Sequence, residues 1–183
     1  MHKPLSTGAT IGILGGGQLG RMLSAAAARL GFRSHIFEPG VACPASHVAD
    51  QLTTASYTDT NALQRFAETV DVITYEFENI PTSALDVLEQ VATIRPGREA
   101  LRISQDRLTE KDFLNSLGLK TAPYAAIDDA PALGAALIAF GTAAILKTRR
   151  FGYDGKGQVR LQPDSDPQAA VADLAGQAAL LEG

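Results

Sequence analysis

The sequence predicts an α/β protein in which a parallel sheet, covered by helices on both faces, is followed by a smaller α+β unit. In the first half of the chain, short apolar runs alternate with helical patterns, which is typical of a doubly wound parallel sheet. After residue 97 this alternation stops, and two helical segments follow one another. The composition is 45% hydrophobic and 20% charged, which is ordinary for a globular protein with a substantial core.

The first unit begins with a βαβ arrangement. TIGIL (10–14) predicts a buried strand, LGRMLSAAAARLG (19–31) a helix ended by Gly31, and RSHIFEPG (33–40) a second strand. We expect the apolar stripe of this helix to consist of Leu19, Met22, Leu23, Ala26, Ala27 and Leu30. A helix at 58–69 capped by Thr58 or Asp59, a strand at 70–78, a helix at 81–91 and a strand at 92–97 follow.

The second unit opens with two successive helices at 98–118, broken near Asp106 and ended by Gly118. Then come a strand within 120–127, a helix at 130–141, strands at 143–147 and 157–161, a helix at 165–175 capped by Asp166, and a strand at 178–183. We place the boundary between 97 and 106, and assign residues 1–97 and 98–183 to two domains.

Charge and cysteine content narrow the range of partners. The net charge of −4 and the pI near 5.3 argue against nucleic-acid binding. A lone cysteine, Cys43, which we interpret as structural, fits a reducing compartment. Neither a signal-peptide pattern nor an apolar run of ~18 residues is evident, so we expect a cytoplasmic protein without a membrane partner. His2, His35 and His47 lack ligand spacing, and we assign no metal site.

The stretch IGILGGGQLGRM (11–22) contains a G-x-G-x-x-G motif at Gly15, Gly17 and Gly20. Such glycines allow a tight strand-to-helix turn, and the N–H groups at the start of the helix can receive an anion. Glu38 lies 18 residues after Gly20, where an NAD-dependent oxidoreductase would bind ribose hydroxyls. Gln18 and Arg21 equally suit a phosphorylated metabolite, and a close turn without any nucleotide is a third interpretation.

A second glycine-rich stretch, ILKTRRFGYDGKGQVRL (145–161), places Lys147 at the end of a strand. The loop after it combines three glycines with the cations Arg149, Arg150 and Lys156, and a further strand follows. A hairpin of this kind can close over a triphosphate. A solvated basic hairpin is the alternative interpretation.

Four motifs in this order, GGGQLGRM, TYEFENIP, DRLTEKDFLNSLGLKTAPY and ILKTRRFGYDGKGQ, resemble the N5-carboxyaminoimidazole ribonucleotide synthetases, an ATP-grasp family of purine biosynthesis. The resemblance runs from about Ile11 to Gly183. It implies a Rossmann-like (pre-ATP-grasp) domain followed by the first lobe of an ATP-grasp domain. It also implies that ATP phosphorylates bicarbonate to carboxyphosphate, whose carboxyl group passes to the amine of 5-aminoimidazole ribonucleotide.

The resemblance also implies roles for individual residues. Asp154 would accept a hydrogen bond from the reacting amine, and Lys156, where the family often has arginine, would stabilise carboxylate or phosphate charge. The positions implied for ATP are Arg107, Lys147, Gly152, Tyr153, Asp154, Gly155, Lys156, Gly157, Gln158 and Glu182. Those implied for the ribotide are Gly17, Gln18, Leu19, Glu76, Tyr153 and Asp154, Glu76 being alternatively a solvated loop carboxylate.

In ATP-grasp enzymes the acidic ligands of Mg²⁺ belong to a second lobe, so the resemblance implies that this sequence is an N-terminal fragment. We therefore expect the chain alone to be inactive, and the full-length protein to form a homodimer. Other ATP-grasp ligases, using formate or glycine, remain open. So do an NAD(P)-binding oxidoreductase, which would leave the second loop unexplained, and a non-catalytic nucleotide-binding module.

Overall fold

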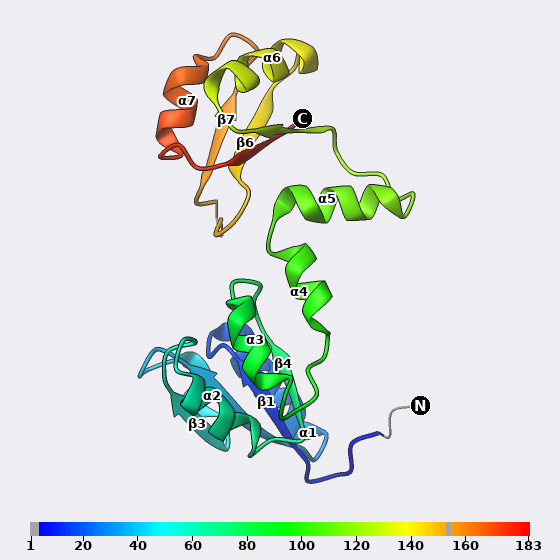
Figure 1. The fold of residues 1–183 in the computed structure, drawn as a ribbon, viewed down its shortest axis with the longest axis vertical. Helices are drawn as coiled ribbons and strands as arrows, with labels where there is room; N and C mark the ends of the chain where they lie inside the picture. The colour runs from blue at the N-terminus through cyan, green and yellow to red at the C-terminus, as the bar shows by residue number, and fades with distance from the viewer. Residues whose placement is uncertain (1–3, 153–154) are drawn as a thin grey trace. The chain divides into compact units, whose positions relative to one another are not determined.

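The computed structural model describes residues 4–152 and 155–183, which form two compact units divided between Leu101 and Arg102 (Figure 1). The helix α4 (Arg98–Ser104) contains the point of division. Within the described part of the chain, none of the helices combines the length and apolarity of a membrane span.

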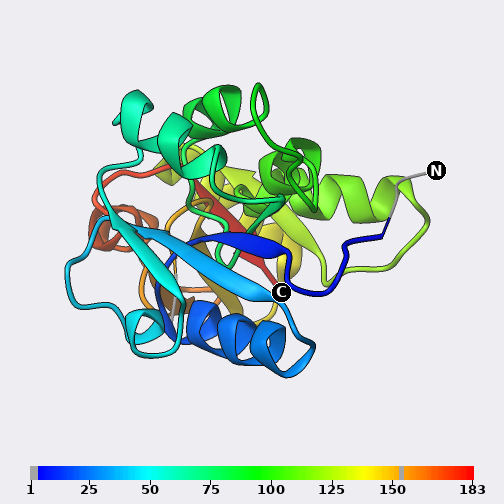
Figure 2. The ribbon, with the colours of Figure 1, turned by 90° about the horizontal axis from the view of Figure 1, so that it is seen from below.

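The first unit is built on a four-stranded parallel sheet of order β3-β2-β1-β4. Its strands are β1 (Thr10–Leu14), β2 (Arg33–Glu38), β3 (Gln51–Thr54) and β4 (Val72–Tyr75). The helix α1 (Gln18–Arg29) and the short 3₁₀ helix η1 (Pro44–His47) cover one face, while α2 (Thr60–Ala67) and α3 (Thr82–Leu88) cover the other (Figure 2). The predicted parallel sheet with helices on both faces is confirmed.

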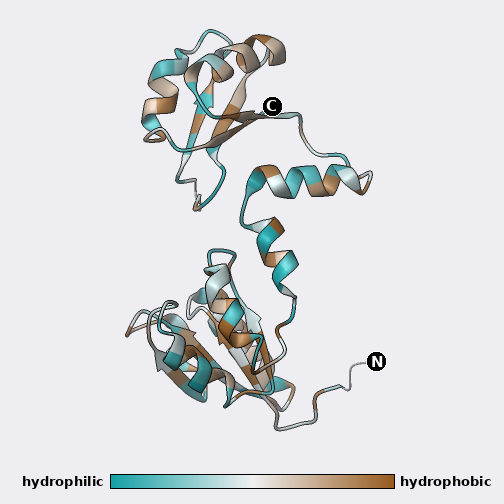
Figure 3. Ribbon diagram, viewed as in Figure 1, coloured by the Kyte–Doolittle hydropathy of each residue, from teal (hydrophilic) through white to brown (hydrophobic). Residues whose placement is uncertain are grey.

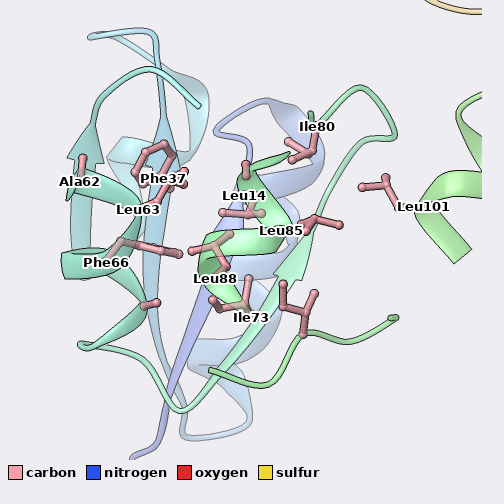
Figure 4. Close-up of a cluster of buried hydrophobic side chains, with 13 residues drawn as sticks. Leu14, Phe37, Ala62, Leu63, Phe66, Ile73, Ile80, Leu85, Leu88 and Leu101 are labelled. Carbon is pink, nitrogen blue, oxygen red and sulfur yellow. The ribbon is translucent and has the colours of Figure 1, made fainter. Parts of the chain in front are cut away.

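Neighbouring residues of each strand enter different cores, because side chains alternate between the faces of a sheet. Leu14 and Phe37 pack with the side chains of α2 and α3, among them Phe66 and Leu85 (Figure 4). Ile13 and Ile36 pack on the opposite face with Cys43 and Ala45. The sheet is therefore buried on both sides, as the apolar run TIGIL of β1 predicts.

The expected apolar stripe of α1 is wrong. The helix buries Gly20, Ser24 and Ala27, whereas five of the six residues of the expected stripe are exposed, Leu19, Met22, Leu23, Ala26 and Leu30. Small side chains let the helix approach the sheet closely: a Cβ on Gly20 would lie 2.5 Å from the carbonyl oxygen of Gly15. The helix thus contacts the sheet through its smallest residues rather than its most hydrophobic ones.

Some element boundaries also differ from the sequence-based expectation. The edge strand β3 was not predicted, because QLTT is short and polar. The expected strand at 92–97 is reduced to one parallel bridge between Ile73 and Ile94. The caps are confirmed: Asp59 accepts the N–H of Ala62 at the start of α2, and Gly31 follows α1 with φ +80°.

His35 is a core residue. Its Nδ1 lies 2.9 Å from Thr69 Oγ1 and its Nε2 lies 2.8 Å from Thr53 Oγ1. Because the hydroxyl of Thr69 donates to the carbonyl of Phe66, it can only accept from His35, so we assign the proton of the neutral ring to Nδ1. Burial lowers the pKa of this imidazole and favours that neutral form.

The second unit contains an antiparallel sheet of order β5-β8-β6-β7. Its strands are β5 (Tyr124–Ile127), β6 (Ala144–Thr148), β7 (Gln158–Leu161) and β8 (Ala179–Glu182), with helices α5 (Arg107–Ser116), α6 (Ala130–Phe140) and α7 (Pro167–Asp173). Helices α6 and α7 pack on the core, whereas α5 buries no residue completely and carries both hydrophilic and hydrophobic side chains (Figure 3). The strand β8 is central, between β5 and β6, so Glu182 reaches the middle of the sheet.

Candidate functional site

The glycine loop of the first unit lies between two glutamates. Strand β1 has β2 and β4 as neighbours, and these end at Glu38 and just before Glu76. The carboxylate of Glu38 accepts the N–H of Gly16 at 2.8 Å. The two oxygens of Glu76 accept the N–H groups of Gly17 and Gly20, both at 3.1 Å.

These bonds correct the expectation that the start of α1 offers its N–H groups to an external anion. A carboxylate of the chain already satisfies the donors of Gly17 and Gly20, where a negative charge is favourable. Glu38 uses its second oxygen for the N–H of Gly40 at 2.9 Å, so it braces the loop on the side of β2. The alternative interpretation of Glu76 as a solvated loop carboxylate is also wrong.

Both glutamates line a cavity of about 330 Å³ in the first unit. The two carboxylates also affect a neighbouring side chain. The pKa of the Tyr57 hydroxyl is raised mainly by burial, and further by the negative charges of Glu38 and Glu76. A cavity with these acceptors suits a ligand that donates hydrogen bonds, such as a ribose hydroxyl or an amine. It is lined by Gly16, Gly17, Glu38, Gly40, Ala42, Cys43, Pro44, Glu76 and Phe77.

Of the residues expected at the ribotide, Gly17 and Glu76 come together in this cavity. Gln18 and Leu19 do not line it and are exposed at the start of α1. Tyr153 and Asp154 lie outside the described residues.

The second unit brings Lys147 and Glu182 together. Lys147, on β6, donates from Nζ to Glu182 Oε2 at 2.5 Å, and Lys111, on α5, donates to Glu182 Oε1 at 2.8 Å. Partial burial alone would raise the pKa of Glu182, but the hydrogen bonds and charges of Lys111 and Lys147 outweigh it and hold the pKa below its usual value. Glu182 is therefore ionised at neutral pH.

Lys147 and Glu182 line a cavity of about 520 Å³, where β6 begins and where β7 and β8 end. Its remaining walls mix apolar side chains with one cation, Arg160, and comprise Ala143, Ala144, Ile145, Leu161, Gln162 and Gly183. An apolar wall beside cationic groups can hold a flat base with an attached phosphate.

The start of α5 is tied to the end of β6. Asp106 caps the helix by accepting the N–H groups of Leu108 and Thr109. Its two carboxylate oxygens also share the single Nε–H of Arg149, at 3.0 and 3.1 Å, and one of them accepts from Arg149 Nη2 at 2.7 Å. Burial would raise the pKa of Asp106, but these bonds and the charge of Arg149 hold it below its usual value. Arg107 donates to the carbonyl of Gly152 at 3.2 Å. Two residues expected at ATP, Arg107 and Gly152, are thereby in contact.

The glycine-rich segment closes a β6–β7 hairpin, in which Lys147 faces Gln158 across the ladder. Gly157 has φ +67°, and a Cβ there would lie 2.6 Å from Thr148 Oγ1, so only glycine fits. Gly155, with φ +78°, and the exposed Lys156 belong to the same loop. The two residues between Gly152 and Gly155 are outside the described part of the chain.

The sequence pattern did not single out Lys111 or Arg160. Lys111 follows Arg107 by one helical turn, and residues at this spacing share a face of a helix. That spacing is the signal that could have suggested Lys111. Arg160 carries no such signal, because its place in the cavity depends on the pairing of β7 with β6.

Across residues 4–152 and 155–183, His, Cys, Asp and Glu side chains form no group of three that could hold a metal ion. The described residues therefore do not fit a Mg²⁺ ion held by protein ligands alone.

The fold and the two sites define a pre-ATP-grasp domain joined to part of an ATP-grasp domain. Residues 8–105 match the ribonucleotide synthetase preATP-grasp domain, and residues 112–183 match the ATP-grasp domain. Since the first match covers more than half of the chain, the protein belongs to the ribonucleotide synthetase preATP-grasp family.

Its relatives are N5-carboxyaminoimidazole ribonucleotide synthases. The chain is 54% identical over 181 residues to the one from Brucella melitensis, covering 98% of this chain and 50% of that protein. A synthetase solved as an ADP complex matches with a TM-score of 0.91 and 40% identity, over 100% of this chain and 48% of the other. The Aspergillus clavatus enzyme, solved with ADP and 5-aminoimidazole ribonucleotide, matches with a TM-score of 0.82 and 28% identity, over 96% and 46%. The chain thus spans about half the length of these relatives.

Proposed function

We propose that the chain is the nucleotide- and ribotide-binding half of an N5-carboxyaminoimidazole ribonucleotide synthetase. In the proposed reaction bicarbonate attacks the γ-phosphorus of ATP, and ADP leaves as carboxyphosphate forms. The amine of 5-aminoimidazole ribonucleotide then attacks the carboxyl carbon, phosphate leaves, and a proton passes from nitrogen to solvent. The observation that carries the proposal is the Lys147–Glu182 cavity, lined by both strands of the β6–β7 hairpin, in a chain 54% identical to such a synthase.

In the first unit, we assign ribotide binding to Gly17 and Glu76, with Gln18 and Leu19 at the rim. Glu76 accepts hydrogen bonds from the N–H groups of Gly17 and Gly20. The remaining lone pairs of its carboxylate would accept hydrogen bonds from ribose hydroxyls. The acidic cavity would repel a phosphate. The phosphate of the ribotide would therefore point away from it.

In the second unit, Lys147 and Arg107 would contact ATP phosphate, and the loop from Gly152 to Gln158 would cover it. Asp154 would orient the attacking amine and Lys156 would stabilise the charge that develops on the carboxylate or phosphate. Tyr153 would contact both ligands, and Glu182 would mark the start of the adenine wall.

The matched relatives are about twice as long as this chain, and we assign the remaining parts of the synthetase to the half of their sequence that the chain does not match. We assign to it the Mg²⁺ ligands, the second ATP-grasp lobe and the contacts that complete a homodimer. Residues 1–97 and 98–183 would be the two domains present here. A cytoplasmic location fits the free thiol of Cys43.

The nucleotide site is tested by calorimetric titration of the chain with ADP. We expect Lys147→Met to weaken ADP binding by about 10-fold or more, because it removes one of the two cations that line the cavity (a charge-assisted hydrogen bond is worth roughly 1.5–3 kcal/mol). The exposed Lys120→Met, which removes the same charge outside the cavity, is the control. Equal affinities of the two variants, or thermal stabilisation by NADH instead of ADP, would contradict the proposal.

We also expect the 183-residue chain to release no measurable phosphate from ATP in the presence of bicarbonate and 5-aminoimidazole ribonucleotide. The chain spans about half the length of the matched synthases, and we assign the second ATP-grasp lobe, which would complete the nucleotide site, to the other half. Turnover of ~1–10³ s⁻¹, as in ordinary enzymes, would show that this half is catalytically sufficient.

A further inference from the structure

Glu182 is held by two lysines from two different elements, one on each carboxylate oxygen. Lys147 lines the cavity of the second unit, but Lys111 does not. All three side chains are mostly buried, with exposed fractions of 14% for Lys111 and 21% each for Lys147 and Glu182. Because these side chains are largely shielded from solvent, their charges are weakly screened. The net charge of the three groups therefore determines the local electrostatic potential.

Lys111 is fixed in this position from a second side. Its Nζ lies 5.5 Å from the centre of the Tyr124 ring, and Tyr124 pairs with Glu182 across the β5–β8 ladder. The Tyr124 hydroxyl donates to Asp112 at 2.7 Å, and Asn115 donates to that hydroxyl at 3.3 Å. The ring is thus anchored by α5 itself, and it seats the ammonium group of Lys111 beside the carboxylate.

Lys111 changes the net charge that an anionic ligand meets near Lys147. An isolated Lys147–Glu182 pair is neutral, and its lysine has little attraction left for an anion. With Lys111 included, the three groups carry a net charge of +1. Arg160 lines the same cavity from β7 and adds its own charge in either case.

We propose that Lys111 is a positioning residue that shares the carboxylate of Glu182 with Lys147, so that Lys147 can turn to the phosphate of a nucleotide while Glu182 stays paired. This inference rests on the nucleotide site proposed above. Lys111 acts through Glu182 and does not itself touch the nucleotide.

The test is a double-variant comparison of ADP affinity, measured by calorimetry. Lys111→Met leaves a neutral pair and should weaken ADP binding on the order of five-fold, the effect of about one incompletely screened charge interaction. Adding Glu182→Gln restores the net charge of +1, so Lys111→Met/Glu182→Gln should bind ADP more tightly than Lys111→Met alone. Lys111→Arg keeps the charge and should bind like the wild type, as should the control Lys120→Met.

A second readout follows the carboxylate directly, by ¹³C NMR titration of Glu182 without nucleotide. The pKa of Glu182 should rise in Lys111→Met, where Lys147 is its one remaining hydrogen-bonded cation, and stay unchanged in Lys120→Met. Lys111 and Lys147 face it from α5 and β6, Tyr124 is its cross-strand neighbour on β5, and Arg160 lines the same cavity from β7.

The outcomes separate the two proposals. If wild-type protein fails to bind ADP, the proposed nucleotide site is overturned. If wild-type protein binds ADP and Lys111→Met binds it equally well, charge sharing is overturned and the nucleotide site stands. A loss of affinity in Lys111→Met that Glu182→Gln does not restore would show that Lys111 merely supports the packing of α5, and would also overturn the inference.

Discussion

Replacing Gly20 by alanine is expected to destabilise the first unit by about 2–3 kcal/mol, although alanine is the better helix former. A Cβ at this position would lie 2.5 Å from the carbonyl oxygen of Gly15. That carbonyl cannot move away easily, because Gly15 has φ +103° and its N–H donates to the carbonyl of Phe37 at 2.9 Å. The helix would have to lift from the sheet, and its N–H bond from Gly20 to Glu76 would weaken.

Gly134→Ala is the matched control, since Gly134 also lies inside a helix, α6. A Cβ there would meet its nearest neighbour, Pro167, at 3.5 Å, which is an ordinary contact. This variant should therefore gain about 0.5–1 kcal/mol from helix propensity. Hydrogen exchange of β1 and β6 peptides in urea measures the two units separately. Stabilisation of β1 by Gly20→Ala would show that α1 does not pack on Gly15 as described.

The outline of the fold follows from local patterns. TIGIL in β1 and AIL in β6 are short, mostly apolar runs. The glycines after β1 mark a turn into a helix, and Asp59 and Asp166 cap helices by bonds to N–H groups two or three residues ahead. Each of these signals acts over a few residues. The sequence is therefore sufficient to predict the elements and the order of the two units.

Elements that depend on tertiary contacts were not predicted. Nothing in QLTT marks β3 as a strand, and it pairs because β2 offers an open edge. The face of α1 that contacts the sheet is not its most hydrophobic face. It is the face of the small residues Gly20, Ser24 and Ala27, which lets the backbone of the helix lie close to the glycine loop. A short distance between backbones can outweigh the burial of a leucine or methionine.

The candidate sites show the same division. The glycine positions and Lys147 could be assigned from motifs, but the partners of these residues are far away in the sequence. Glu76 follows Gly17 by 59 residues, and Glu182 follows Lys147 by 35. Only the strand orders bring Glu38 and Glu76 to either side of the loop and place β8 in the centre of its sheet. The motifs therefore mark the donors, which are the glycine N–H groups and Lys147. The order of the strands determines that Glu38, Glu76 and Glu182 lie next to them as acceptors.

Glu76→Ala is expected to destabilise the first unit by about 2–4 kcal/mol, because two backbone donors lose a charged acceptor at once. The N–H groups of Gly17 and Gly20 both donate to this carboxylate at 3.1 Å, at the positive end of α1. Urea unfolding followed by hydrogen exchange of β1 measures the effect. Glu78→Ala, two residues further on, removes the same charge from a side chain with no hydrogen bond in the described part of the chain, and should change stability by less than about 0.5 kcal/mol.

The same variant tests whether the glycine loop is an anion site that the chain occupies itself. Glu76 and Gly17 line the cavity of the first unit, so in the variant an oxyanion that enters this cavity can replace the carboxylate as the acceptor. Sulfate at millimolar concentration should then stabilise Glu76→Ala more than wild-type protein, with sodium chloride at equal ionic strength excluding a general salt effect. Equal stabilisation of both proteins by sulfate would mean that the loop relaxes when the carboxylate is removed. The N–H groups of Gly17 and Gly20 would then depend on Glu76 for their orientation, and the glycine motif alone would not make an anion site.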